Sequence, residues 1–277
     1  MLYVIFFVLY DKINKSDGDI MDSVNKTLYI PLYGKALVNE LGIILRDQKA
    51  SDIWKKEGFE LNRKSKSTYL AYFIAMRARV FDDWVKDNIN KYEDSTVIHI
   101  GCGLDSRCLR VNTNAKWYDI DFKEVIDIRK NYYSETDNYH MIGNDIREIS
   151  WDFIDSKNVI VVMEGISMYM KYEDIQDLFY KLYEHFNHIS LLMDCYSEFG
   201  AKMSKYKNPV HEVGVSDVYG LDNPDILNHT GIKYIASHEL TPIRLINELS
   251  GIDKIIFNKL YSGNMAKKIY KLYEFRR

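Results

Sequence analysis

The sequence predicts an α/β fold: a mostly parallel sheet of seven strands with an antiparallel last strand, covered by helices. From about residue 95 onward, short apolar runs alternate with amphipathic segments, which is the order of a doubly wound sheet. The run at 97–100 ends in Gly101 and Gly103, as a strand does where backbone or a ligand must come close. The final run, KKIYKLYEF, alternates apolar and polar residues, which is typical of an antiparallel strand added late to a parallel sheet.

The seven strands are predicted from short runs rich in β-branched and aromatic residues. They cover residues 97–100, 117–120, 140–142, 159–163, 189–193, 232–236 and 269–275. Between them, residues 123–133 and 173–186 have apolar residues at helical spacing and are predicted to be helices.

Residues 21–92 are predicted to form a mainly helical layer over the sheet. The segment SKSTYLAYFIAMRARVFDDWV carries an apolar stripe at spacings of three and four, which indicates an amphipathic helix whose stripe belongs to the core. The stripe consists of Tyr69, Tyr72, Phe73, Met76, Val80 and Trp84. Upstream, Pro31 and Gly34 are turn signals among aromatic residues.

The chain is therefore divided into an appended segment (1–20), a helical N-terminal cap (21–92) and a core (93–277). Within the core, residues 196–230 break the rhythm of strands and helices and are predicted to be an insertion or lid. The opening run MLYVIFFVLY is apolar, but far shorter than the roughly 20 residues of a membrane-spanning helix. Three interpretations of it stay open: an added structural element, a membrane-touching segment, or a start codon upstream of Met21. The first and third are favoured over membrane contact.

Composition excludes several classes of protein. A net charge of −3 over 277 residues gives no basic surface for nucleic acid. The three cysteines are too few and too scattered for a disulfide framework or a zinc site, and no metal site is predicted. With neither a membrane span nor a signal peptide predicted, the protein is expected in the cytoplasm.

Two interpretations of the glycine turn in STVIHIGCGLDSRCLRV, residues 95–111, compete: a turn that serves only the fold, and one that lets backbone approach a ligand. Ser106 stands where a dinucleotide-binding fingerprint has its third glycine, and the GK[ST] ending of a phosphate-binding loop is absent. A bound pyrophosphate is therefore not supported. A ligand with a carboxylate and an adenosine would suit the loop, because the following helix directs free N–H groups at the same spot.

Acidic residues follow the next three predicted strands. Asp121 lies 20 residues after Gly101 at the end of the second strand, where a carboxylate accepts hydrogen bonds from ribose hydroxyls in this architecture. Asp119 points to the same side of that strand but lies deeper. Asp145 and Glu164 follow the third and fourth strands, at the edge where such sheets bind ligands. The alternative role of Asp145 is a helix cap.

Four strings, VIHIGCGLDSR, YDIDFKEVIDIRK, NDIR and VVMEGISMYM, resemble the successive motifs of the leucine carboxyl methyltransferase family. That family also contains bacterial polyketide O-methyltransferases of the tetracenomycin type. The resemblance covers about residues 26–195 well, and VYGLDNPDIL and the terminal strand more loosely. It implies a class I methyltransferase fold, which is Rossmann-like, and S-adenosylmethionine as the cofactor.

By this resemblance, six residues line the cofactor, from its methionine part through its ribose and adenine to its sulfonium. In that order they are Gly101 and Gly103, Asp121, Asp145 and Ile146, and Glu164. The family also places an arginine of the N-terminal helix on the cofactor carboxylate. In RARVFDD we choose Arg79, although Arg77 flanks the apolar stripe at a similar angle on the opposite side. Lys35 in PLYGKA is the further basic residue expected at the site.

Methyl transfer from a sulfonium is an in-line displacement, in which positioning of the acceptor supplies much of the acceleration. A carboxylate acceptor is already ionised at neutral pH and needs no general base, and no catalytic residue is assigned. None of the seven histidines has an obvious catalytic setting, and His99 is expected in the core. A phenol or alcohol acceptor would need a base, for which His211 in the predicted lid is the first candidate.

The acceptor is expected to be a small planar or partly apolar molecule that contacts Tyr29, Tyr33, Tyr169 and His211. The predicted function is S-adenosylmethionine-dependent O-methylation of a carboxylate of a small, polyketide-like molecule. Within the family, the alternative acceptor is a protein C-terminal carboxylate. Outside it, the alternatives are a nicotinamide-dependent oxidoreductase, disfavoured by Ser106, and a nucleotide-binding module without turnover. The sequence names neither the acceptor nor the oligomeric state.

Overall fold

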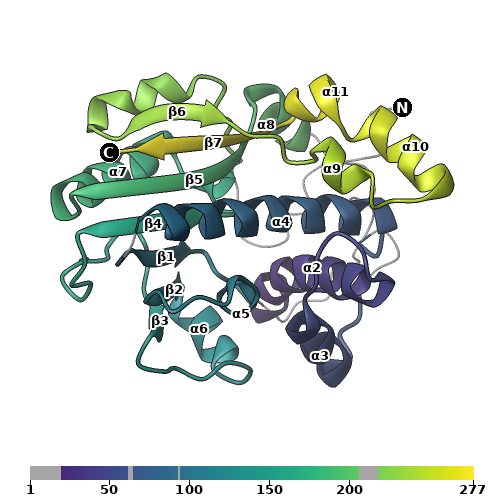
Figure 1. Ribbon diagram of the computed structural model, residues 1–277, viewed down its shortest axis with the longest axis horizontal. Coiled ribbons are helices and arrows are strands. Elements are labelled where there is room, and N and C mark those ends of the chain that lie inside the picture. Colours follow the sequence, from purple (N-terminus) through teal and green to yellow (C-terminus); the bar gives the residue numbers. More distant parts are fainter. Residues whose placement is uncertain (1–19, 62–64, 93, 206–217) are drawn as a thin grey trace.

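Seven strands form one sheet in the order β3-β2-β1-β4-β5-β7-β6 (Figure 1). The computed structural model describes residues 20–61, 65–92, 94–205 and 218–277. The predictions for the first 19 residues and for His211 therefore lie outside the described residues. The strands are β1 (Thr96–Ile100), β2 (Trp117–Asp121), β3 (Tyr139–Gly143), β4 (Asn158–Met163), β5 (His188–Tyr196), β6 (Lys233–Ser237) and β7 (Tyr270–Arg276).

The predicted mixed sheet is confirmed. The pairs β1–β2, β1–β4, β2–β3 and β4–β5 are parallel, and β7 runs antiparallel between β5 and β6. The carboxyl ends of the parallel strands therefore meet along one edge of the sheet. The strand predicted at 189–193 continues to Tyr196.

Helices cover both faces of the sheet, and α4 (Thr68–Lys91) lies along one of them (Figure 1). The predicted stripe of α4 is confirmed at Tyr72, Met76 and Trp84, which are buried in the same apolar cluster as inward side chains of β1 and β4. The opposite face is covered by α7 (Tyr172–His185), the helix predicted at 173–186. The other helices of the core are α5 (Arg107–Val111), α6 (Lys123–Arg129), α8 (Glu198–Lys205), α9 (Ile243–Ile246), α10 (Gly251–Leu260) and α11 (Gly263–Lys267).

The N-terminal layer packs against the segment that follows β1. Two further helices belong to it, α2 (Ile20–Leu41) and α3 (Gln48–Glu57). These two helices and the segment after β1 share an apolar cluster. It includes Leu32 and Ala36 of α2, Ile53 of α3, and Cys102 and Leu104. The layer therefore rests directly on the glycine loop, which we define as residues 101–105.

The turn predicted at Pro31 and Gly34 is wrong, because α2 runs through both residues. A proline inside a helix removes one backbone hydrogen bond and is unfavourable by local propensity. Here α2 packs against α4, and a β-carbon on Gly34 would lie only 3.2 Å from the α-carbon of Ala71. Gly34 thus allows the two helices to approach closely, and tertiary packing outweighs the turn signal.

Two other boundaries differ from the prediction. The helix predicted at 123–133 ends at Arg129, and Tyr133 instead turns under the glycine loop, where its hydroxyl donates to the carbonyl of Leu104. In the predicted insertion, Tyr196 completes β5, and a short 3₁₀ helix, η3 (Pro224–Thr230), precedes β6.

None of the helices in the described part of the chain has the length and hydrophobicity that crossing a bilayer would require.

Candidate active site

The predicted site residues gather where the parallel strands end. Gly101 and Gly103 follow β1, Asp121 ends β2, and Glu164 follows β4. Asp194, which was not predicted from the sequence, lies near the end of β5. Because β2, β1, β4 and β5 are neighbours in the sheet, these residues share one edge. We call this group of residues, with the α2 and α4 side chains that contact it, the strand-end site.

The glycine loop has an unusual backbone that its glycines make possible. Gly101 and Gly103 have φ angles of +69° and +51°, in the left-handed region that glycine adopts at little cost. A β-carbon on Gly101 would lie 2.2 Å from Cγ2 of Ile166, so Gly101 also serves the packing of the segment after β4. The loop therefore needs glycine for the fold, whatever it binds.

Gly103 is held on both sides by charged side chains. Its N–H donates to Oδ2 of Asp121 at 2.8 Å, and its carbonyl accepts from Nη1 of Arg129 at 2.9 Å. Arg129 is itself fully buried and paired with Asp119, which lies deeper in β2 as predicted. These two hydrogen bonds fix the position of the glycine loop relative to the sheet.

Asp121 lies where the sequence predicts it, facing the glycine loop. Its second oxygen, Oδ1, accepts from the N–H of Phe122 at 2.8 Å. Burial raises the pKa of Asp121 above its ordinary value, and the hydrogen bonds from Gly103 and Phe122 oppose that rise. Each carboxylate oxygen can accept more than one hydrogen bond, so both can still receive a ribose hydroxyl.

The arginine of α4 that contacts the strand-end site in the structure is Arg77, whereas the residue chosen from the sequence was Arg79. Arg77 donates from Nε to Oε1 of Glu164 at 2.9 Å and from Nη1 to Oδ2 of Asp194 at 3.0 Å. Arg79 instead pairs with Asp83 and with a backbone carbonyl of the N-terminal layer, and it is partly exposed. The rotation of α4 about its axis decides between the two, and that rotation follows from packing on the sheet.

One nitrogen of Arg77 is left over for a ligand. Nη1 also donates to the hydroxyl of Tyr270 at 2.9 Å, whereas Nη2 has no hydrogen-bond partner among the described residues. Nη2 lies beside Gly165, where a β-carbon would be 3.4 Å away. A carboxylate at this position would meet a cationic donor, which is the chemistry that the methionine part of the cofactor needs.

Glu164 is held as an anion by two arginines. Besides Arg77, it pairs with Arg107, the arginine of the GLDSR string, which is fully buried. Burial alone would raise the pKa of Glu164, but Arg107 and Arg77 lower it to about 2. An ionised carboxylate at the end of β4 is suited to a neighbouring positive sulfonium.

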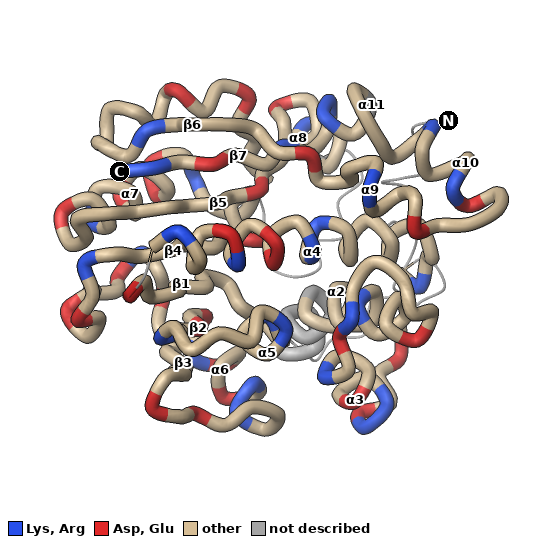
Figure 2. The backbone as a smooth tube through the Cα atoms, in the orientation of Figure 1, with Lys and Arg blue, Asp and Glu red and all other residues tan. Residues whose placement is uncertain are grey.

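Arg107 and Arg110 also contact the strand-end site, although neither was predicted from the sequence. Arg107 donates to Asp82 of α4 at 2.8 Å, and Arg110 pairs with the same aspartate at 2.7 Å. Arg110 also pairs with Asp47, the residue that caps α3, at 2.7 Å. Figure 2 marks both acidic and basic residues on α4, whereas the charged residues of α5 are basic. The two arginines directly after the glycine loop were a signal in the sequence, but their partners are distant in the chain.

Lys35 is brought to the strand-end site, as predicted. Its ammonium pairs with Asp105 of the glycine loop at 2.9 Å, and both side chains are buried. Asp105 also pairs with Arg110 at 2.6 Å and with Arg107 at 3.3 Å. Burial alone would raise the pKa of Asp105, but these cations hold it well below its ordinary value.

The other predicted residues are less closely joined to this group. Asp145 and Ile146 lie in a turn just after β3, where Asp145 accepts from the backbone and side chain of Arg147 and caps no helix. Tyr169 belongs to a short 3₁₀ helix after Glu164 and is 40% exposed. Two aromatic residues of α2 point elsewhere: Tyr29 stacks on Phe59 of the N-terminal layer, and Tyr33 contacts Trp54 of α3.

His99 occupies a structural position, as predicted. Its ring is buried, with Nδ1 3.1 Å from Oδ1 of Asp119 and Nε2 3.1 Å from Nη1 of Arg107. Both ring nitrogens are therefore engaged within the core, and His99 has no free nitrogen to act as a base.

Comparisons with known proteins identify the family of this chain. The family model for leucine carboxyl methyltransferase matches residues 22–183, more than half of the chain. Tetracenomycin polyketide synthesis O-methyltransferase TcmP of Streptomyces glaucescens is 27% identical over 209 residues, covering 74% of this chain and 77% of its own. The S-adenosyl-L-methionine-dependent methyltransferase dpfgK of Gibberella zeae is 24% identical over 242 residues, covering 77% and 81%.

The fold is shared with solved methyltransferases. The crystal structure of magnesium protoporphyrin IX methyltransferase from Synechocystis PCC 6803 with bound S-adenosylhomocysteine aligns with a TM-score of 0.50. The alignment covers 82% of this chain and 94% of that one, at 13% sequence identity. At this identity the likeness supports the fold alone.

Proposed function

We propose that this chain, which belongs to the leucine carboxyl methyltransferase family and is an S-adenosylmethionine-dependent methyltransferase, methylates a carboxylate oxygen of a small, polyketide-like molecule. The family and the cofactor exclude the nicotinamide-dependent oxidoreductase considered from the sequence. The observation that carries the proposal is the strand-end site, where Arg77, Asp121 and Glu164 present the charges that the cofactor's parts require.

The residues of the strand-end site fit the cofactor, which supplies an activated methyl group on a sulfonium when it is bound. Nη2 of Arg77 and the ammonium of Lys35 would hold its carboxylate, and Asp121 its ribose hydroxyls. Glu164 would lie near the sulfonium. Asp145 and Ile146, after β3, would border the adenine. The glycine loop between these groups admits the ligand close to backbone.

A carboxylate acceptor agrees with the groups that the site offers. Glu164 and Asp194 are both engaged with Arg77, and His99 is enclosed by Asp119 and Arg107. None of these three is free to remove a proton from a phenol or an alcohol. A carboxylate needs no such base, and orientation with exclusion of water can supply the rate enhancement. His211 stays the predicted base for the alternative acceptor class.

The likeness to TcmP supports a polyketide-like acceptor rather than a protein C-terminus. The matched relative is named for polyketide synthesis, and the match covers about three quarters of both chains. We therefore propose that the protein acts in small-molecule biosynthesis. A cytoplasmic location stays a prediction from the sequence.

The test uses S-adenosylmethionine radiolabelled in its methyl group and a panel of aromatic carboxylic acids, each paired with its amide and its phenol analogue. Methyl esters are hydrolysed by mild alkali, whereas methyl ethers are stable. We expect label in the organic product of the acids only, released as methanol after alkali. Label that survives alkali, or transfer to the phenols and amides, would contradict carboxylate methylation.

A further inference from the structure

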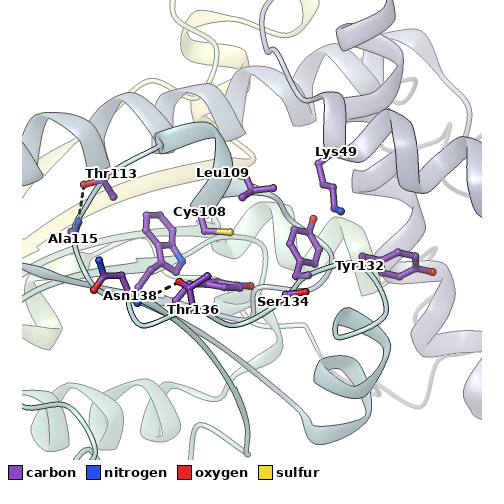
Figure 3. Close-up of a pocket in the computed structure, with 12 residues that line it drawn as sticks. Lys49, Cys108, Leu109, Thr113, Ala115, Tyr132, Ser134, Thr136 and Asn138 are labelled. Atoms are coloured by element: carbon purple, nitrogen blue, oxygen red, sulfur yellow. Dashed lines mark hydrogen bonds between the residues drawn. The ribbon is translucent and has the colours of Figure 1, made fainter.

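We propose that a cavity at the amino ends of β2 and β3 is a second small-molecule site, which takes a planar aromatic anion and acts on the glycine loop. The cavity has a volume of about 320 Å³. It is lined by Trp117, the first residue of β2, and by Tyr139, the first residue of β3. Cys108 of α5 also lines it (Figure 3). Asp121 of the strand-end site lies at the opposite end of β2, so the two sites are distinct.

The lining of the cavity determines the class of ligand. Four aromatic side chains are among those that line it, those of Trp117, Tyr132, Tyr133 and Tyr139. Such side chains favour a flat ring, because stacked and edge-on contacts add to the burial of apolar surface. The volume lies at the lower end of the range of small-molecule pockets, about 300 to 1,000 Å³. A compact aromatic molecule of one to three rings therefore fits.

Lys49 supplies the charge. Its ammonium lies 5.2 Å from the ring centre of Tyr133 and forms no ion pair with any described residue. Lys56, which lies over the neighbouring Tyr132, is by contrast paired with Glu57. An anionic group on the ligand would therefore find Lys49 available at the cavity wall.

Tyr139, which lines the cavity, is connected to the glycine loop by hydrogen bonds through Arg129. The hydroxyl of Tyr139 accepts from Nε of Arg129 at 3.0 Å and donates to Oδ2 of Asp119 at 2.7 Å. Arg129 in turn donates to the carbonyl of Gly103 at 2.9 Å. A ligand that shifts the ring of Tyr139 would thus act on the hydrogen bond that holds Gly103.

A second residue that lines the cavity contacts the loop directly. The hydroxyl of Tyr133 donates to the carbonyl of Leu104 at 2.9 Å, and its ring lies 4.0 Å from the guanidinium carbon of Arg129. Two neighbouring carbonyls of the glycine loop are therefore held from the cavity side. The coupling between the two sites rests on the proposed placement of the cofactor at this loop, whereas the binding of the aromatic anion does not.

The binding experiment is calorimetric titration of the full chain with 2-naphthoate, without cofactor. The variants are Lys49→Glu and, as a matched charge reversal on an exposed lysine of α4, Lys86→Glu. We expect saturable binding of 2-naphthoate to the wild type. Lys49→Glu should lower the affinity by about tenfold or more, because it removes one charge-assisted contact, whereas Lys86→Glu should leave the affinity unchanged. Equal binding to all three proteins, or no binding to the wild type, would overturn the site.

The coupling experiment measures the affinity for S-adenosylhomocysteine with and without saturating 2-naphthoate. We expect a change of about threefold or more in the wild type and none in Lys49→Glu. The affinity for 2-naphthoate should change by the same factor when S-adenosylhomocysteine is present, because coupling free energies are reciprocal. An unchanged affinity would overturn the coupling. Failure of S-adenosylhomocysteine to bind at all would instead count against the strand-end site, and the 2-naphthoate titration would still test the cavity.

Discussion

Arg77 of α4 pairs with Glu164 at the end of β4, with Nε and Oε1 2.9 Å apart, although the two residues are 87 positions apart in the sequence. Asp194 of β5 and the hydroxyl of Tyr270 on β7 hold a second nitrogen of the same guanidinium. The N-terminal layer and three strands of the sheet thus orient one cation at the strand-end site. The strand-end site, of which this arrangement is one part, leads to four predictions about the cofactor and the stability of the fold.

Replacement of Arg77 should weaken cofactor binding more than replacement of Arg79. Arg77→Lys keeps a charge among Glu164 and Asp194 but loses the fork of donors, and we expect about a tenfold or greater loss of affinity for S-adenosylhomocysteine. Arg79→Lys alters a partly exposed pair with Asp83 and should change the affinity less than twofold, within about 0.4 kcal/mol. Calorimetric titration of both variants checks the ranking, and the reverse order would return Arg79 to the site.

Asp121→Ala should weaken cofactor binding and leave the fold intact. The ribose hydroxyls and the N–H of Gly103 would lose their acceptor, at a cost of about 1–3 kcal/mol. Asp127→Ala on the adjacent helix removes an exposed carboxylate that pairs with Lys123 and serves as the control. Titration with S-adenosylhomocysteine distinguishes them, and equal affinities would remove Asp121 from the site.

Tyr270→Phe should raise the KM for S-adenosylmethionine with little change in kcat. The lost hydroxyl accepts from Arg77 and donates to Asp194 at 2.9 Å, so it orients Arg77 without needing to contact the reacting atoms. One such hydrogen bond contributes about 1 kcal/mol, or roughly fivefold in KM. Tyr273→Phe is the matched control, a buried tyrosine of the same strand that donates to the carbonyl of Leu221. Equal effects of both variants on KM would point to a merely structural role for Tyr270.

Acid should destabilise the fold in a way that depends on Glu164. Its pKa is lowered from an ordinary value of 4.5 to about 2 by Arg107 and Arg77, against the opposing effect of burial. The ionised form therefore stabilises the folded state above pH 4.5, and this contribution is lost as the pH falls from 4.5 towards 2.

The measurement is the free energy of unfolding of the wild type and of Glu164→Gln at about pH 6 and pH 3. We expect the difference between the two pH values to be smaller in the variant. Part of the acid sensitivity should persist, because Asp119 and Glu274 also have pKa values lowered to about 2. An identical pH dependence in both proteins would show that Glu164 does not contribute.

The sheet was predictable because buried strands leave short apolar runs, and each predicted run falls on an observed strand. The prediction of a turn at Pro31 from the local sequence was wrong, because contacts of α2 with α4 outweigh the turn signal. Gly103 and Asp121 could be predicted from their spacing, because they follow and end two neighbouring parallel strands, whose carboxyl ends lie side by side. A local sequence pattern indicates the secondary structure that a segment prefers. The predictions fail where contacts with segments distant in the sequence determine the structure instead.

The choice between Arg77 and Arg79 shows this limit most clearly. Both flank the same stripe, and only the rotation of α4 on the sheet brings Arg77 to Glu164. The role of Arg107 was hidden for the same reason, since its partners Asp82 and Glu164 lie 25 and 57 positions away in the sequence.

A crystal structure of the protein with S-adenosylhomocysteine tests the central claim most directly. We predict that the carboxylate of the ligand lies within hydrogen-bond distance of Nη2 of Arg77, with the ribose hydroxyls on Asp121 and the sulfur near Glu164. A ligand bound away from the glycine loop, or a carboxylate held by Arg79 instead of Arg77, would contradict the account.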